Sequence, residues 1–486
     1  MVQKAMGSSK AVETDMKKSN QLLSPNTRAL LCQYAASASA TISVIMSGNS
    51  LGWPSPALPR LLGPDSPVPM DKDDSSWMIS LMYLGNLFSP IPCGILMERI
   101  GRKMTLLYLN LFPFSSWLII LLTRSTYWLY LARFLAGLWL GIVYTVVPIY
   151  LGEIAEPRIR GSLSTLFAIT TYVGILFEYV LGPYVSYDAL ALASGSFCII
   201  FILAFGWMPE TPYFLIKNGE KARARESLHW LRGAPNNVDE ELYKIESAIQ
   251  QQKLQKGKLK DLLATKGNRK ALIIVGVLSV FQRFSGIGAM IAYTSVTLPK
   301  GSLGPIGRDE CVIILGVVWV TSTFIASFLI DKLGRKSLLI VSSVGCAIAT
   351  FLAGLWFLLN ELTYIDVSGF DWSPFICFVL HGFFYSIGLN PIVTTVKGEV
   401  FSACIKGVAS AITTLMLALA SFILNKSYQM IADYIGMYMN YWLYALGCVL
   451  AVIFTVTYVV ETKGRTLQEI QDELNGANCE NEISKL

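Results

Sequence analysis

Long runs without charged residues alternate in this sequence with short segments in which the charges gather. A helix needs about 20 apolar residues to cross a hydrocarbon core of about 30 Å, because each residue adds about 1.5 Å of length. Backbone groups find no water to bind in lipid, so each such run must be helical. Twelve runs are long enough, and they cover approximately 29–59, 76–97, 104–123, 125–152, 162–187, 189–209, 271–299, 312–330, 337–360, 372–396, 407–432 and 434–460. The sequence therefore predicts an all-α polytopic membrane protein with twelve transmembrane helices.

The composition excludes most other classes of protein. Only 15% of the 486 residues are charged and 53% are hydrophobic, whereas a soluble globular domain carries roughly a quarter charged residues. Basic segments separated by membrane spans cannot form one continuous nucleic-acid surface. The sequence contains no metal-ligand spacing, nucleophile arrangement or phosphate-binding loop. We therefore expect no enzyme, no catalytic residues, no metal and no cofactor; the expected partners are the lipid bilayer and a small-molecule substrate, with no nucleic acid, and the oligomeric state stays open.

The distribution of lysine and arginine predicts the orientation in the membrane. An even number of spans places both termini on one side, and the basic residues gather in the two tails and in the connections on that same side. Basic loops stay in the cytoplasm, so both termini are predicted to be cytoplasmic. The predicted organisation is an N-terminal tail at 1–28, a six-helix half at 29–209, a helical linker at 210–270, a second six-helix half at 271–460 and a C-terminal tail at 461–486.

The two ends of the chain bear on its location in the cell. Residues 1–28 are polar and lack the apolar stretch of a cleavable signal peptide, so we expect the first span to direct insertion. The chain ends in Ser484-Lys485-Leu486, which matches a peroxisomal address. That address is normally read on matrix proteins. We therefore expect a multi-pass protein of the plasma membrane, with the peroxisome as the alternative.

Three charged motifs occur twice, at similar positions in the two predicted halves. The segment Glu98 to Lys103 returns as Asp331 to Lys336, Gly152-Glu153 with Arg160-Gly161 returns as Gly398-Glu399 with Lys406-Gly407, and Glu210-Thr211 returns as Glu461-Thr462. Each motif places an acid or a base beside a predicted helix end, where charge-assisted pairs can form. We expect such pairs to clamp the cytoplasmic ends together when the protein faces outward. The predicted gate comprises Glu98, Arg99, Arg102, Glu153, Arg160, Glu210, Asp331, Arg335, Glu399, Lys406 and Glu461.

With these motifs in place, the sequence resembles the sugar porter family of the major facilitator superfamily over nearly its whole length. The motifs that carry the resemblance are Gly94-x-x-x-Glu98-Arg99-x-Gly101-Arg102-Lys103, Arg133-x-x-x-Gly137-x-x-x-Gly141, Val147-Pro148-x-Tyr150-x-x-Glu153-x-x-x-Pro157-x-x-Arg160-Gly161, Pro209-Glu210-Thr211-Pro212, Gln282-x-x-Ser285-Gly286-Ile287, Asp331-x-x-Gly334-Arg335-Lys336 and Glu461-Thr462-Lys463-Gly464. The stretch Pro54-Ser55-Pro56-Ala57-Leu58 resembles insect facilitated trehalose transporters. The resemblance implies the major facilitator fold and the movement of mono- or disaccharides by alternating access.

The positions at which this family contacts sugar are mostly changed. The resemblance implies that Ala168, Arg283, Gly288, Trp319 and Thr394 stand where amides or an aromatic residue are usual, while Gln282 is retained. Losing groups that both donate and accept should weaken ordinary hexose recognition. The candidate substrate contacts are Gln282, Arg283, Tyr293, Trp319, Asn390 and Thr394.

Arg283 is predicted to lie near the middle of the membrane, where a charge needs a partner. One interpretation is a buried ion pair with Glu178, the intramembrane acid of the fifth span. The other is that Arg283 faces the cavity and binds a carboxylate or phosphate of the substrate. Arg133, early in the fourth span, fits the structural arginine of the family, and we expect it to act in packing or gating.

The leading functional hypothesis is a facilitative carbohydrate transporter for trehalose or a hexose. Proton coupling in the family commonly uses an acid in the first span, and no Asp or Glu occurs between Ala29 and Pro59. The resemblance therefore implies downhill uniport. The alternatives are a transporter of the same fold for a non-sugar, possibly anionic, solute, and a sugar sensor that does not transport.

Overall fold

The computed structural model describes residues 25–156, 158–233, 238–254, 262–299, 306–362, 367–401 and 405–475. The described chain is helical throughout its regular structure. Eleven of its helices are long and apolar enough to span a membrane, and the pair α4 (Lys72–Phe88) and α5 (Pro90–Ile100), bent by 45°, forms one more span. The predicted all-α fold with twelve transmembrane helices is confirmed.

The first six spans use nine helices, because several spans are broken. These helices are α2 (Pro25–Gly52), α3 (Pro54–Leu61), α4, α5, α6 (Arg102–Leu109), α7 (Leu111–Leu122), α8 (Thr126–Ile154), α9 (Arg160–Leu181) and α10 (Tyr187–Phe205). The sixth span ends at Phe205, four residues before the predicted end, because Gly206 caps α10. Three short helices follow, namely α11 (Pro212–Lys217), α12 (Lys221–Arg232) and α13 (Val238–Leu254).

The last six spans have the same kind of organisation. Their helices are α15 (Lys266–Phe284), α16 (Ile287–Thr297), α17 (Arg308–Leu333), α18 (Arg335–Leu362), α19 (Ser373–Ile387), α20 (Leu389–Val400), α21 (Lys406–Tyr434) and α22 (Met437–Tyr458). The short 3-10 helix η2 (Ser368–Phe370) precedes α19, and α23 (Leu467–Asn475) follows the last span. Several helices begin a few residues before the predicted apolar runs. The hydrogen-bonded backbone continues beyond the apolar stretch, so hydropathy alone places these boundaries too late.

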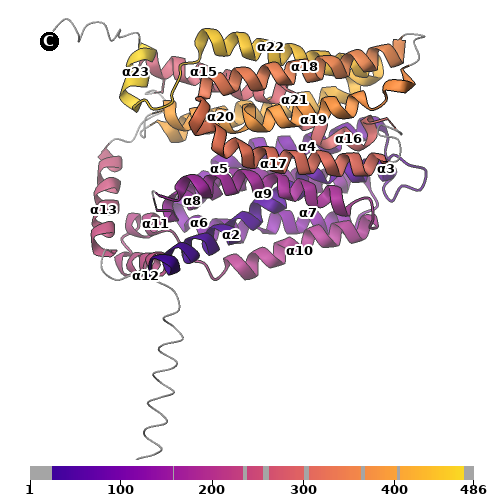
Figure 1. Cartoon of the computed structure of the whole chain (residues 1–486). Helices are drawn as coiled ribbons and strands as arrows, with labels where there is room; N and C mark the ends of the chain where they lie inside the picture. Colours follow the sequence, from indigo (N-terminus) through magenta and orange to yellow (C-terminus); the bar gives the residue numbers. More distant parts are fainter. Residues whose placement is uncertain are drawn as a thin grey trace, which may run out of the picture.

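The two groups of six spans lie side by side, the first drawn in indigo to magenta and the second in pink to yellow (Figure 1). The helices α11, α12, α13 and α23 lie at one end of the bundle, which we call the linker end. The opposite end carries α3 and the turn at η2, and we call it the loop end. We call the two groups of spans the first half and the second half.

The most extensive contacts between the halves lie toward the loop end. There α4 packs against α21, α9 against α17, and α3 against α16. The hydroxyl groups of Ser55 and Ser295 are 2.6 Å apart across this boundary, and the Tyr179 hydroxyl donates to the Ile291 carbonyl at 2.7 Å. The protein is therefore closed at the loop end.

Close packing within the first half depends on small residues. At Gly137 of α8 a Cβ atom would lie 1.9 Å from the Met82 carbonyl oxygen of α4, so only glycine fits. Close approach of helix backbones through small residues is how membrane helices gain van der Waals contact. The Gly137 of the sequence motif thus serves packing.

Breaks in two spans of the second half place polar backbone groups in the middle of the bundle. Gly286, between α15 and α16, has φ of +87°, and a Cβ there would meet the Tyr444 ring at 2.3 Å. Gly388, between α19 and α20, interrupts the tenth span. A broken helix leaves carbonyl groups without their usual partners, and in a membrane these groups must be satisfied by protein or by water.

Candidate substrate site and gate

Gln282 connects the two broken spans. It lies in the last turn of α15 and is 3% exposed. Its Nε2 donates to the carbonyl oxygens of Leu389 and Asn390, each at 3.1 Å. These carbonyls belong to the first turn of α20, next to the break. The Gln282 amide nitrogen therefore stabilises the backbone at the break in the tenth span. Its amide oxygen is a hydrogen-bond acceptor.

Arg283 follows in the same turn, but it points into different surroundings. Its side chain is half-buried, and its Nε atom is buried without a hydrogen bond. Its charge acts on the phenol groups of four tyrosines, three from the first half and one from the second: Tyr83 of α4, Tyr144 of α8, Tyr172 of α9 and Tyr385 of α19. Arg283 thus lies at the boundary between the halves.

The expected ion pair between Arg283 and Glu178 is wrong. Glu178 is fully buried, and it accepts a hydrogen bond from the Ser194 hydroxyl on α10. The arginine whose charge acts on Glu178 is Arg133, in the first half. The sequence placed the two residues at compatible depths, but packing turned Glu178 toward its own half.

Arg133 has the packing role that we expected as one of two possibilities. Its Nη1 donates to the Ser50 carbonyl at 2.7 Å and its Nε to the Met78 carbonyl at 3.3 Å. Its guanidinium also lies 5.5 Å from the centre of the Trp53 ring. Arg133 therefore ties the fourth span to the first and second spans, next to the junction of α2 and α3.

The other four candidate contacts have separate environments. Tyr293 is buried and stacks on Tyr428 with ring centres 4.4 Å apart. Trp319 is buried against Tyr172 and Tyr179 of α9, so it packs across the boundary. The Asn390 side chain is half-buried, and the exposed Thr394 donates to the Pro391 carbonyl at 2.7 Å. The structure brings Gln282 into contact with the Asn390 carbonyl and packs Trp319 against Tyr172, one of the tyrosines on which the charge of Arg283 acts.

Five residues of this region were missed in the sequence, namely Tyr83, Tyr144, Tyr172, Tyr385 and Asn425. A Cβ at Gly288 would lie 2.9 Å from Asn425 Nδ2 and 3.3 Å from the Tyr83 hydroxyl. The eleventh span thus supplies an amide beside the position where the sequence resemblance implied that one was lost. A lone buried asparagine in an apolar span was the available signal for Asn425. The tyrosines carried none, because aromatic residues occur throughout the spans.

At the linker end, Arg102 organises a cluster within the first half. Its side chain is 3% exposed, and Nη2 lies 2.9 Å from Glu153 and 3.4 Å from Glu98. The guanidinium also lies 5.5 Å from the Phe214 ring of α11. Glu210 accepts hydrogen bonds from the backbone N–H groups of Arg102 and Lys103, at 3.2 and 3.0 Å.

The second half repeats this arrangement with equivalent residues. Arg335 Nη2 lies 2.9 Å from Glu399. Glu461 accepts from the backbone N–H groups of Arg335 and Lys336, both at 2.9 Å. The Thr462 hydroxyl donates to the second carboxylate oxygen of Glu399 at 2.6 Å. The repeated motifs therefore form two copies of one cluster.

A glycine with positive φ precedes the arginine in each copy. Gly101 has φ of +97° and Gly334 has φ of +86°. A Cβ at Gly101 would lie 2.2 Å from Glu210 Oε2, and one at Gly334 would lie 2.9 Å from Glu461 Oε2. Both the backbone conformation and the space for the carboxylate thus require glycine.

The pKa values of the two equivalent glutamates are shifted in opposite directions. Burial raises the pKa of Glu210 above its ordinary value, although hydrogen bonds from the N–H groups of Thr211 and Lys103 act against it. Burial also acts to raise the pKa of Glu461, but the backbone N–H groups around it outweigh burial and the pKa lies below its ordinary value. The carboxyl group of Glu461 therefore stays ionised to a lower pH than the carboxyl group of Glu210.

Four other residues of the predicted gate lie outside these two clusters of described ion pairs. Arg99 and Arg160 are exposed, and Arg160 has a polar contact elsewhere. The side chains of Asp331 and Lys406 lie outside the described part of the structure. The ion pairs described above for Arg102 and Arg335 each join residues of the same half. The clamp expected for an outward-facing state stays a prediction.

Two ion pairs join the halves at the loop end, between α4 and α21. Lys426 Nζ bonds the Asp73 carboxylate, donates to the Ser76 hydroxyl at 2.8 Å, and lies 4.4 Å from the centre of the Trp77 ring. A second pair has the opposite polarity, with Lys72 on α4 and Asp433 on α21 at 3.2 Å. We call these two pairs the loop-end latch.

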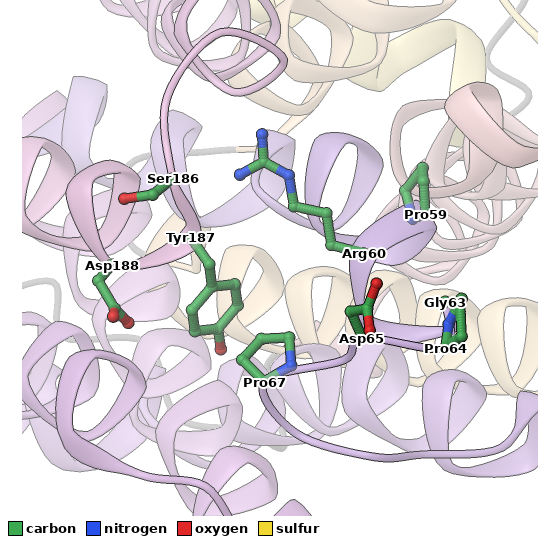
Figure 2. Close-up of a pocket in the computed structure, with 9 residues that line it drawn as sticks. All are labelled: Pro59, Arg60, Gly63, Pro64, Asp65, Pro67, Ser186, Tyr187 and Asp188. Atoms are coloured by element: carbon green, nitrogen blue, oxygen red, sulfur yellow. The ribbon is translucent and has the colours of Figure 1, made fainter.

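A shallow cleft of about 460 Å³ lies at the loop end of the first half, beside the start of α10 (Figure 2). Arg60 donates to the Gly182 carbonyl at 2.8 Å, and Asp188 pairs with Arg124 at 3.0 Å. The polar groups of this cleft thus mostly serve the α9–α10 turn. It is separate from the region of Arg283.

Comparison with known proteins gives a consistent result. A family model described as "Sugar (and other) transporter" matches residues 19–474. The chain is 34% identical over 454 residues to the "Facilitated trehalose transporter Tret1" of Drosophila willistoni, covering 91% of this chain and 51% of that protein. It is 33% identical to the proteins of the same name from Apis mellifera ligustica and Bombyx mori, covering 88% and 90% of their lengths. The chain spans about half the length of the Drosophila relatives.

Solved structures with the same fold include two of a bacterial transporter. The chain matches the "partially occluded inward open conformation of the xylose transporter XylE from E. coli" with a TM-score of 0.74 at 20% identity, covering 90% of this chain and 99% of that one. A structure of the proton:xylose symporter XylE bound to 6-bromo-6-deoxy-D-glucose matches with a TM-score of 0.72, also at 20% identity, and the match covers 91% of this chain and 99% of that one. At this identity the likeness shows the fold.

Proposed function

This chain belongs to the sugar (and other) transporter family, and we propose that it moves a sugar down its concentration gradient by alternating access. The observation that supports this most is the pair of equivalent clusters at the linker end, Arg102 with Glu153 and Arg335 with Glu399. Two halves of similar construction that meet closely at one end are what alternating access requires.

We assign the linker end to the cytoplasm and the loop end to the outside. The excess of lysine and arginine at the linker end supports this orientation. The contacts at the loop end then exclude an outward-open conformation. We also retain the predicted division into two halves at 29–209 and 271–460, the linker at 210–270, and cytoplasmic tails.

Trehalose and hexoses are the sugars to test first, because relatives at 33–34% identity are named for trehalose. Downhill uniport follows from the first span, which carries no Asp or Glu between Ala29 and Pro59. Membership of a transporter family argues against a sensor, and relatives named for a sugar argue against a non-sugar solute.

The test is uptake into vesicles that contain the purified full chain. Labelled trehalose and glucose should equilibrate without a proton gradient, and unlabelled sugar inside should accelerate entry by exchange. Protein-free vesicles measure leakage. Accumulation above equilibrium that collapses with a protonophore would refute uniport, and the absence of any exchange across a panel of sugars would refute sugar transport.

We place the protein in the plasma membrane. The alternative is the peroxisome, because of Ser484-Lys485-Leu486, which lies outside the described residues. Imaging of a chain tagged at the N-terminus, with and without Leu486, decides between them. A peroxisomal signal that is lost on removal of Leu486 would refute our placement.

A further inference from the structure

Arg283 carries a charge near the middle of the seventh span. Among the residues that the structure describes, no carboxylate pairs with it, and its buried Nε makes no hydrogen bond. The acid at a compatible depth, Glu178, bonds Ser194 instead. A guanidinium is always charged in proteins, so either water or a bound anion must compensate this charge.

The surroundings of Arg283 are polar but neutral. The Tyr83 hydroxyl of the first half reaches the seventh span near Arg283, because a Cβ at Gly288 would lie 3.3 Å from it. The charge of Arg283 also acts on the phenol groups of Tyr144 in the first half and Tyr385 in the second. The Arg283 side chain is itself only half-buried, and the Tyr144 side chain, whose charge environment it shares, is 39% exposed. Water therefore solvates Arg283 in this conformation.

Alternating access changes that solvation. When the halves close around a substrate, water leaves the region between them, and an unpaired charge becomes much more costly to bury. A neutral sugar leaves Arg283 unpaired in that state. A substrate with a negative group pairs with it, and the pairing is strongest when water has been excluded.

We propose that Arg283 and the surrounding tyrosines bind an anionic group, a carboxylate or a phosphate, of a sugar substrate. This inference rests on the proposed sugar transport and adds to it a preference for sugar acids or sugar phosphates over neutral sugars. The planar fork of arginine matches the two oxygens of either group. Phenol hydroxyls such as those of Tyr83 and Tyr385 can donate to the remaining oxygen atoms, and Asn425 beside Gly288 can bond sugar hydroxyls.

Binding to the purified full chain in detergent tests this directly. Thermal stabilisation is titrated with glucuronate, glucose 6-phosphate, glucose and trehalose at pH 7.5 and constant ionic strength. At least one anionic sugar should half-saturate the protein at a concentration at least tenfold lower than glucose. The one that does so identifies carboxylate or phosphate as the group. Equal half-saturation by all four sugars would overturn the proposal, as would acetate or inorganic phosphate binding as tightly as the sugar anions.

Substitutions of Arg283 test whether this residue causes the preference for anionic sugars. Arg283→Gln should lose the tenfold preference for the anionic sugar, and Arg283→Lys should keep part of it because the charge remains without the fork. Arg124→Gln, at an exposed arginine paired with Asp188, is the matched control and should keep the full preference. An unchanged preference in folded Arg283→Gln overturns the proposal. If that variant does not fold, an unchanged preference in Arg283→Lys overturns it.

Exchange in vesicles separates this inference from the proposed function. Preferential binding of sugar anions without exchange of any sugar would support the anion site and refute transport. Exchange of neutral sugars with no preference for anionic ones would support transport and overturn the anion site.

Discussion

Arg102 and Glu153 form an ion pair of 2.9 Å in which the arginine side chain is 3% exposed and the glutamate 14%. Removing one member of such a pair leaves a buried charge without compensation, at a cost of about 3 kcal/mol. Arg102→Met and Glu153→Gln should each lower the midpoint of thermal unfolding, and the double variant should lose less than the sum. The equivalent pair Arg335 and Glu399 is more exposed, so the same changes there should cost less. Additive losses at Arg102 and Glu153 would contradict the pairing.

Alanine at Gly101 should be more harmful than alanine at Gly334. Both glycines have positive φ with extended ψ, a conformation that costs other residues about 1–3 kcal/mol. At Gly101 the new Cβ would also displace the Glu210 carboxylate, which is 2.2 Å away against 2.9 Å for the equivalent contact at Gly334. Yield of folded protein and unfolding midpoint measure the difference. Equal losses would show that the carboxylate moves freely.

The two equivalent glutamates should respond to pH in opposite directions. The pKa of Glu461 is lowered on folding, so its contribution to stability is present above its unfolded pKa and is lost as the pH falls through the folded value. The cost of Glu461→Gln should therefore be constant between pH 7 and 5 and fall below about pH 4.5. The pKa of Glu210 is raised, so the parent should gain stability relative to Glu210→Gln as the pH falls through the folded value toward the ordinary pKa of a glutamate, about 4.3. Identical pH profiles for the two variants would refute this assignment.

Weakening the loop-end latch should open that end. Lys426→Met removes the bond to Asp73 and the contact with Trp77, and exposed pairs contribute about 0–1 kcal/mol each. Thiol labelling of Ser55→Cys, which is buried against Ser295, should therefore become up to several-fold faster. Lys72→Met breaks a more exposed pair and is the control, with a smaller expected effect. Labelling that stays at the parent rate would exclude a latch.

Replacing Gln282 should lower the stability of the folded protein. Gln282→Glu keeps the shape but removes both amide donors to the Leu389 and Asn390 carbonyls, so we expect a loss of about 1–3 kcal/mol in the free energy of unfolding. Gln250→Glu, at an exposed position of α13, controls for the added charge. A variant with parental stability and altered sugar affinity would instead identify Gln282 as a substrate contact alone.

The sequence determined the fold of this protein because lipid leaves the backbone few choices. Each uncharged run long enough to cross the bilayer had to be helical, so their number and order could be read directly. The repeated motifs around Arg102 and Arg335 were also readable, since a duplicated cluster keeps its spacing within each half. Boundaries such as Lys72 and Phe205 were less certain, because caps and charged turns extend or shorten a helix beyond its apolar run.

The site was decided only by the tertiary structure. Arg283, Glu178 and Arg133 lie in different spans, and which two interact depends on helix rotation, which hydropathy does not report. Packing turned Glu178 toward Ser194 and left Arg283 among tyrosines at the boundary between the halves. Contacts between residues more than a hundred positions apart, such as Gln282 with Leu389, arise from the breaks in two spans. Their geometry follows from how the whole bundle packs.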